Sequence, residues 1–144
     1  MPTYRVATTV AVDPAVVFEA VAHLPGHAAW AADPIEIAAV DDKPVGVGKR
    51  YTSTATSKGK TFTADLVVTE YDVPGCFAFS AVDATGVYGH RFTITRDGTG
   101  AKVERVIEGD LTPSQRLLFA LVYLPVKRPN ARKAMTKLKY LLER

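Results

Sequence analysis

The order of the expected elements constrains the fold of this chain more than any other feature of its sequence. Alternating apolar residues from Tyr4 to Val12 predict an opening strand, and Asp13-Pro14 then begins a short apolar helix. Hairpin-forming segments fill the middle of the chain, and the last part reads as helix. When one long helix crosses a curved antiparallel meander, side chains need not fill all the space between them. This order of elements therefore predicts a hollow between sheet and helix.

The middle of the chain predicts an antiparallel sheet. Short strand character at 35–37 is followed by expected strands at 48–57, 61–72, 76–83, 87–96 and 101–111. Residues typical of tight turns separate them, namely Lys58-Gly59, Pro74-Gly75, Thr85-Gly86 and Asp97-Gly98-Thr99-Gly100. Because parallel neighbours need a long crossover, connections this short force the strands to pair antiparallel.

Helices are expected at both ends of the chain. The first should run to Ala22 and stop before Pro25-Gly26, and a second short one should cover about 27–32. The terminal helix opens at Thr112-Pro113-Ser114, and Pro125 and Pro129 should kink or break it. After Asn130 an amphipathic stripe follows at Ala131, Met135, Leu138 and Leu142.

The segment from Leu117 to Leu124 is apolar almost all round. A helix apolar on every side is typical of one buried on every side. We expect it to be clamped between sheet and loops, to face a dimer partner, or to line an apolar cavity.

Size and composition favour one domain, residues 1–144, in the soluble globular class. Of the 144 residues, 47% are hydrophobic and 23% are charged. A single cysteine, Cys76, excludes an internal disulfide, and neither a secretory signal nor a membrane-spanning apolar run is visible. We therefore expect a cytoplasmic protein.

The net charge of +3 hides an asymmetry. Residues 127–144 hold seven Lys/Arg against one Glu, so the rest of the chain is net acidic. Such a helix could approach an anionic membrane, or its charges could form a solvated outer face. Nucleic acid is not an expected partner, because no recognised binding motif accompanies the basic residues.

Several short motifs, taken in order, resemble one family. They are Asp13-Pro14-x-x-Val17-Phe18, Trp30, Gly46-x-Gly48, Val68-x-Glu70-x-x-x-Pro74 and Leu138-Lys139-x-x-Leu142-Glu143. Over the whole chain they resemble the START-like (SRPBCC-type) superfamily of polyketide cyclases/dehydrases and lipid-transport proteins. The resemblance implies an α+β helix-grip fold, in which about seven antiparallel strands curve around a long C-terminal helix, with two short helices after the first strand. It also implies a ligand cavity but no universal catalytic motif, so the chemistry stays open.

Strand alternation predicts which residues face that cavity. The inward apolar sets are Phe62, Ala64, Leu66 and Val68, then Phe77, Phe79 and Ala81, then Tyr88, Phe92 and Ile94, and then Val103, Ile107 and Gly109. His90 and Arg105 fall among them. A buried arginine must be paired, so Arg105 is expected to meet a ligand carboxylate or phosphate, or Glu70. His90 could orient a carbonyl or transfer a proton. Alternatively, Arg105 reaches a sheet edge and His90 is a hydrogen-bonded core residue.

The candidate ligand-binding residues combine these inward positions with the terminal helix. Tyr51, Tyr88 and Trp30 could present ring surface and a polar atom to a ligand, or simply pack in the core. The full set is Trp30, Tyr51, Phe62, Leu66, Phe79, Tyr88, His90, Phe92, Arg105, Ile107, Leu121 and Met135.

Other site chemistry finds no support in the sequence. Pro25-Gly26 separates His23 from His27, so no helix presents both to a metal, and we expect neither metal nor cofactor. Cys76 has no evident activating histidine, and no catalytic residue is predicted.

Three functional hypotheses remain. The leading one is binding or carriage of a hydrophobic small molecule, lipid, isoprenoid or polyketide-like, between the sheet and the C-terminal helix. The second is a cyclase/dehydrase-type enzyme in which His90, Arg105 or Tyr88 assists proton transfer or stabilises an enolate. The third is a protein or membrane interaction role, or a homodimer, that uses the apolar stretch Leu117–Val126 and the basic helix after it.

Overall fold

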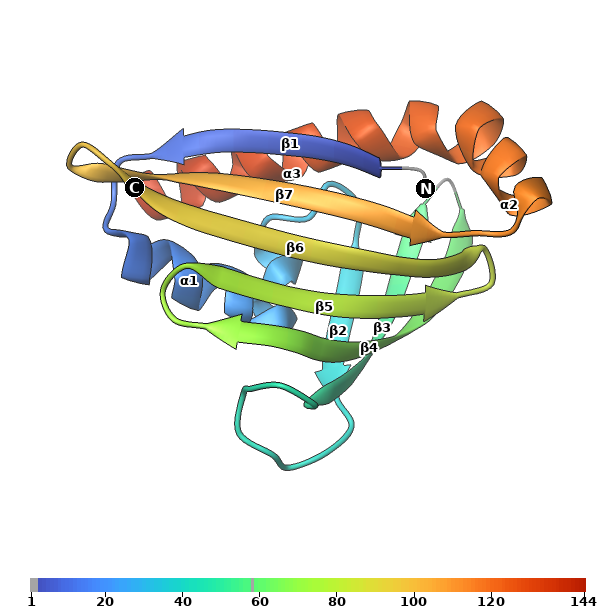
Figure 1. The fold of residues 1–144 in the computed structure, drawn as a ribbon, viewed down its shortest axis with the longest axis horizontal. Coiled ribbons are helices and arrows are strands. Elements are labelled where there is room, and N and C mark those ends of the chain that lie inside the picture. Colours follow the sequence, from blue (N-terminus) through green and yellow to red (C-terminus); the bar gives the residue numbers. More distant parts are fainter. Residues whose placement is uncertain (1–2, 58) are drawn as a thin grey trace.

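The computed structural model describes residues 3–57 and 59–144. Its strands form one curved antiparallel sheet in the order β1-β7-β6-β5-β4-β3-β2, with the helices gathered on one face (Figure 1). This is the predicted helix-grip fold. The strands are β1 (Thr3–Val10), β2 (Ile35–Ala39), β3 (Arg50–Ser57), β4 (Lys60–Asp72), β5 (Cys76–Asp83), β6 (Gly86–Asp97) and β7 (Gly100–Asp110).

The predicted strand boundaries lie within a few residues of the observed ones. The turn between β6 and β7 contains Gly98 at φ 62°, in the left-handed region that favours glycine. The turn predicted at Lys58-Gly59 lies partly outside the described residues, because Lys58 is not described. Within β4 a bulge shifts the register between Val68 and Glu70, and alternation did not predict it.

The first helices follow β1 as expected, with one correction. α1 (Pro14–Ala22) is capped by Asp13, whose carboxylate accepts the Ala15 N–H at 3.0 Å. The 3₁₀ helix η1 (Leu24–Ala29) includes Pro25 and Gly26, which were expected to separate two helices. Pro25 fits because the first turn of a helix does not need its missing N–H.

The terminal helix is continuous but changes type. α2 (Pro113–Leu118) begins with a capping box between Thr112 and Gln115. A π turn, η2 (Phe119–Tyr123), joins it to α3 (Leu124–Glu143), and Pro129 lies inside α3 without ending it. Pro125 has no N–H to donate to the carbonyl four residues earlier, so the wider turn falls where an α-turn could not be completed.

The apolar segment at the start of this helix is exposed in the single chain, so the expectations that it is clamped between sheet and loops or that it lines the cavity are wrong. The exposed fractions of Leu117, Leu118, Leu121 and Val122 are 63%, 46%, 70% and 53%. Of residues 113–123, Phe119 alone is buried, with its ring centroid 6.2 Å from that of Tyr4. The segment lies at the end of the sheet, where little of the concave face remains to cover it (Figure 1). In the described chain, no helix combines the length and hydrophobicity needed to cross a bilayer.

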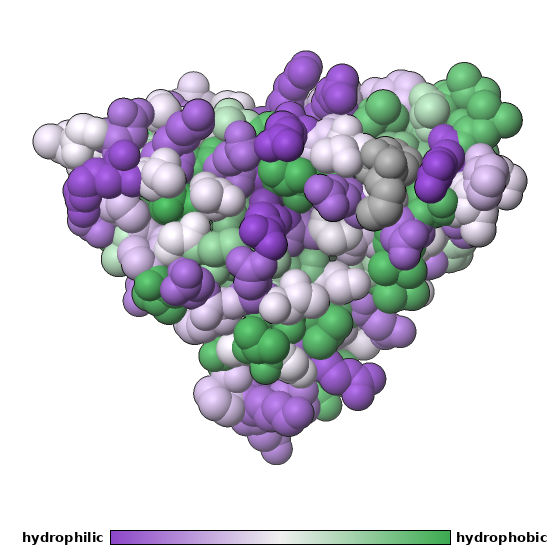
Figure 2. All heavy atoms as spheres, viewed as in Figure 1, coloured by the Kyte–Doolittle hydropathy of each residue, from purple (hydrophilic) through white to green (hydrophobic). Residues whose placement is uncertain are grey.

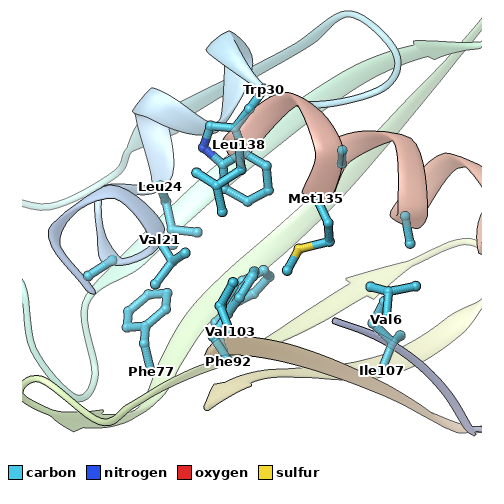
Figure 3. Packing of buried hydrophobic residues seen from close by; sticks show 14 of the residues in the cluster. Val6, Val21, Leu24, Trp30, Phe77, Phe92, Val103, Ile107, Met135 and Leu138 are labelled. Carbon is cyan, nitrogen blue, oxygen red and sulfur yellow. The ribbon is translucent and has the colours of Figure 1, made fainter. Parts of the chain in front are cut away.

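The core lies between the sheet, α1, η1 and the later part of α3. Figure 3 shows Val21 and Leu24 above Phe77 and Met135 pointing from α3 toward the sheet. These side chains and Leu138 are at most 2% exposed. This packing joins the helix to the sheet on the α1 side of the molecule.

Candidate ligand cavity

A cavity of about 270 Å³ lies between α3, the sheet and the chain that follows η1. Most of its apolar lining is small or aromatic, and its polar lining includes two cations. The lining residues are Tyr4, His27, Trp30, Ala31, Ala32, Asp33, Ile35, Ala55, Arg105, Ile107, Lys127, Asn130, Ala131 and Ala134. A hollow between sheet and helix, predicted from the order of elements, is therefore present.

Arg105 is the most unusual residue of the cavity wall. It lies on β7, diagonally across the sheet from His90 on β6, and its Nη2 donates a hydrogen bond to His90 Nδ1 at 3.0 Å. Its Cζ lies 5.0 Å from the centroid of the Phe92 ring. Its Nε is buried without a hydrogen-bond partner among the described residues. Arg105 makes no ion pair with a carboxylate of the described chain.

His90 serves as an acceptor for Arg105. A guanidinium has only donors, so Nδ1 of His90 must be unprotonated and the ring proton must be on Nε2. The ring stacks on Phe79, with centroids 4.7 Å apart and planes inclined by 6°. Burial, and then the nearby Arg105 charge, hold the pKa of His90 well below its usual value. His90 is therefore neutral at pH 7.

Two further titratable groups of the wall are also neutral at pH 7. His27 Nε2 donates to the Val21 carbonyl at 2.7 Å, and burial lowers the pKa of His27 to about 3. Burial raises the pKa of Tyr4 to about 12, although the Arg105 charge opposes this shift. The positive charge of the inner wall therefore comes from Arg105.

Lys127 supplies a second cation, from α3. Its Nζ lies 4.8 Å from the centroid of the Tyr88 ring, and burial lowers the pKa of Lys127. The carboxylate of the lining, Asp33, accepts a hydrogen bond from Asn130 Nδ2 at 3.1 Å and forms no ion pair with a described residue. The arrangement is thus rich in cations and suited to an anion.

The structure brings part of the predicted site together. Trp30, Arg105 and Ile107 line the cavity, and His90 and Phe92 contact Arg105 from the adjacent strand. Leu121 is exposed on η2 and Phe62 is 39% exposed on β4, so neither lines the cavity. The remaining candidates are buried in the core and lie outside the lining, namely Tyr51, Leu66, Phe79, Tyr88 and Met135.

The suggested pairing of Arg105 with Glu70 does not occur. Glu70 instead forms an ion pair with Arg91 and accepts a hydrogen bond from Cys76 Sγ at 2.7 Å. The bulge in β4 explains the difference, because one extra residue reverses which face the following side chains occupy. Glu70 therefore joins Arg91 on the face of the sheet opposite to Arg105.

Sequence reasoning missed five polar residues of the wall, namely Tyr4, His27, Asp33, Lys127 and Asn130. Tyr4 could have been predicted, because it alternates with Val6 on the opening strand and so points to the same inner face of the sheet. His27 was considered only as a metal ligand, although its ring packs against Trp30 with the ring centroids 4.3 Å apart. The sequence could not show that Lys127 and Asn130 face the cavity. The direction of each side chain depends on how far the π turn rotates α3 about its axis.

The curved sheet, the long helix and the cavity between them define a protein of the helix-grip class. Residues 1–143 match the family described as polyketide cyclase/dehydrase and lipid transport, and the chain belongs to this family. The START-like superfamily predicted from the motifs is therefore confirmed. No curated protein matches the sequence.

Solved structures share this fold at low sequence identity. Protein CV1439 from Chromobacterium violaceum has a TM-score of 0.79 and 16% identity, covering 100% of this chain and 99% of its own. TTHA0849 from Thermus thermophilus has a TM-score of 0.80 and 18% identity, covering 98% and 97%. The di-domain ARO/CYC StfQ from the steffimycin biosynthetic pathway has a TM-score of 0.74 and 12% identity, covering 98% of this chain but 44% of StfQ.

Proposed function

We propose that this protein binds or carries a compact hydrophobic molecule bearing one anionic group, held in the cavity between the sheet and α3. The observation that carries the proposal is Arg105, a cation of the cavity wall that no described carboxylate neutralises. A carboxylate or phosphate on a lipid-, isoprenoid- or polyketide-like molecule has the matching chemistry.

Electrostatics support an anionic ligand. A charge removed from water is destabilising unless it is paired and hydrogen-bonded. Arg105 has a neutral imidazole and an aromatic face as partners, and its Nε has none among the described residues. Burial accordingly lowers the pKa of Arg105. An anion beside the guanidinium would compensate this charge, and Lys127 would add a second attraction from α3.

The lining supports a hydrophobic body for the same ligand. Trp30, Ile35 and Ile107 present apolar surface, and the alanines of α3 leave room beside them. Burying apolar ligand surface there contributes about 25 cal/mol per Å². The volume of about 270 Å³ lies close to the lower end of typical ligand pockets, at roughly 300 Å³. A compact ligand therefore fits better than a long, fully enclosed chain.

Native mass spectrometry of the protein purified from its own host, followed by organic extraction, tests this proposal. We expect an extra mass that extraction releases and that carries an acidic group. Arg105→Met should lower the retained fraction by tenfold or more, because a hydrogen bond to a charged group contributes about 1.5–3 kcal/mol. Its free energy of unfolding should stay the same or rise.

Arg91→Met is the matched control, because Arg91 lies on β6 on the opposite face of the sheet from Arg105. It should leave ligand retention unchanged. Loss of stability without loss of ligand in Arg105→Met would assign the arginine a structural role and contradict the proposal. Equal loss of ligand in both variants would contradict it as well.

A cyclase/dehydrase-type enzyme is the second candidate, since a histidine and a cation line the same cavity. A base with a pKa of about 3, as for His27, is too weak to remove a carbon-bound proton efficiently at pH 7. Deuterium exchange into a bound 1,3-diketone, followed by NMR, separates the two functions. Exchange that His27→Gln abolishes would favour the enzyme, and binding without exchange favours carriage.

A further inference from the structure

An exposed apolar surface lies at the end of the molecule, outside the cavity. We call Leu117, Leu118, Leu121 and Val122 the apolar corner. Figure 2 shows hydrophobic residues gathered where Figure 1 places α2. All four corner side chains are at least 46% exposed.

The apolar corner is not needed to hold its own segment on the sheet. That role falls to Phe119, whose ring lies 6.2 Å from Tyr4 and 5.8 Å from Tyr88, measured between centroids. The capping box at Thr112 fixes the start of the same helix. Four large apolar side chains on consecutive turns, with no part in the core, are the signature of an interaction surface.

Charge indicates what kind of partner this surface takes. Residues 113–144 contain eight Lys/Arg and one Glu. Arg116 lies within the corner segment. Arg128 and Arg132 follow on α3, where three arginines (with Arg5) and one carboxylate, Glu108, line an open hollow beside β1. None of Arg116, Arg128 and Arg132 forms an ion pair with another residue of the described chain. A second copy of the chain would bring these like charges together, whereas an anionic lipid surface would attract them.

We propose that the apolar corner docks on an anionic membrane surface, with its leucines inserted at the level of the headgroups and the arginines near lipid phosphates. This combination of exposed apolar residues and basic neighbours is the one that binds the membrane interface without spanning it. Lys127 of the cavity wall follows Val122 by five residues, about 8 Å along a helix. The docked surface therefore adjoins the cavity, although docking does not depend on what the cavity holds.

Vesicle co-sedimentation of the full chain tests the proposal. Vesicles of phosphatidylcholine alone are compared with vesicles that also contain phosphatidylglycerol. We expect binding to the anionic vesicles that added salt weakens. Leu117→Ser with Leu121→Ser should lower the vesicle affinity at least tenfold, because each leucine loses its apolar burial. Arg128→Gln and Arg132→Gln should each lower it roughly fivefold.

Val47→Ser is the matched control, because Val47 is as exposed as the corner leucines but lies in the loop before β3. It should bind vesicles like the wild type, and thermal melting should show that every variant is folded. Equal affinity for both kinds of vesicle would overturn the proposal. A dimer in sedimentation velocity that the double leucine variant dissociates would overturn it too, by assigning the corner to a second copy. Ligand retention in the same variants separates this outcome from failure of the cavity proposal.

Discussion

The space between the sheet and the C-terminal helix differs between its two ends. Where α1 covers the sheet, Leu24, Phe77 and Leu138 are completely buried. Beside residues 127–134 of α3, the cavity wall includes Arg105 and Lys127. Beyond the cavity, the leucines of α2 and η2 face solvent. We call these the packed end and the polar end.

The difference indicates that one end of the layer stabilises the fold and the other end provides the binding residues. The packed end buries large apolar side chains and provides most of the hydrophobic free energy of this layer. The polar end keeps buried charge without a carboxylate partner, which stabilises little or not at all. Binding residues can therefore vary at the polar end while the packed end maintains the fold, and three predictions test this separation.

The largest effect is expected from a cavity made at the packed end. Leu138→Ala should lower the free energy of unfolding by about 2–5 kcal/mol, because Leu138 is fully buried and its neighbours cannot collapse completely into the space. Urea denaturation at pH 7 measures this change. A loss below about 1 kcal/mol would show that the packed end is as loosely organised as the polar end.

Acid should weaken the fold through a histidine at the boundary between the two ends. Burial lowers the pKa of His27 to about 3. Below about pH 6.5, His27 therefore binds a proton in the unfolded chain but stays unprotonated in the folded chain. Its stabilising contribution is complete above about pH 6.5 and is lost as the pH falls toward 3, reaching a loss of about 2 kcal/mol at pH 5. The pKa of His90 is also lowered, mainly by burial, and acts in the same direction.

Urea denaturation at pH 7 and pH 5 measures this acid sensitivity. His27→Gln, which can still donate to the Val21 carbonyl, should reduce the difference between the two pH values. His23→Gln changes an exposed histidine and serves as its control. The interpretation of His27 would be wrong if both variants kept the full difference.

The smallest effect is expected at the apolar corner. Leu121→Ala should change the free energy of unfolding by less than about 0.5 kcal/mol, because its side chain is mostly exposed and leaves no cavity. The same urea titration as for Leu138→Ala measures this change, and both leucines belong to the continuous terminal helix. Similar losses for the two leucines would remove the distinction between the ends.

The fold could be predicted because its signals are local. Period-two alternation and turn residues place the strands, and Asp13-Pro14 starts α1 where expected. Alternation predicted that His90 and Arg105 face inward, and it was reliable here because β6 and β7 pair without a bulge along their whole length. Two side chains on adjacent strands with intact parity are the kind of pair that alternation predicts well.

The errors arose where a distant contact or an inserted residue decides the outcome. Glu70 was misplaced because a bulge reverses the parity of β4 and carries no clear residue signature. For the corner leucines the sequence left burial in the fold and exposure to a partner both open. Hydrophobicity indicates a preference for burial, but it does not show whether the fold offers a surface that can bury them. Lys127 was counted with the solvated charges, although its ammonium lies over the Tyr88 ring.

Because of the π turn at Phe119–Tyr123, the outer surface of this protein depends on the number of residues in that turn. A π turn contains one residue more than an α-turn, which rotates the preceding segment by about 100° relative to the helix that follows. Deleting Ala120 would remove one residue from this turn and point Leu117 in a new direction, while α3 kept its place on the sheet. A relative that differs by one residue here would present another outer face around the same cavity, so a single insertion or deletion can change what the molecule docks on without changing what it holds.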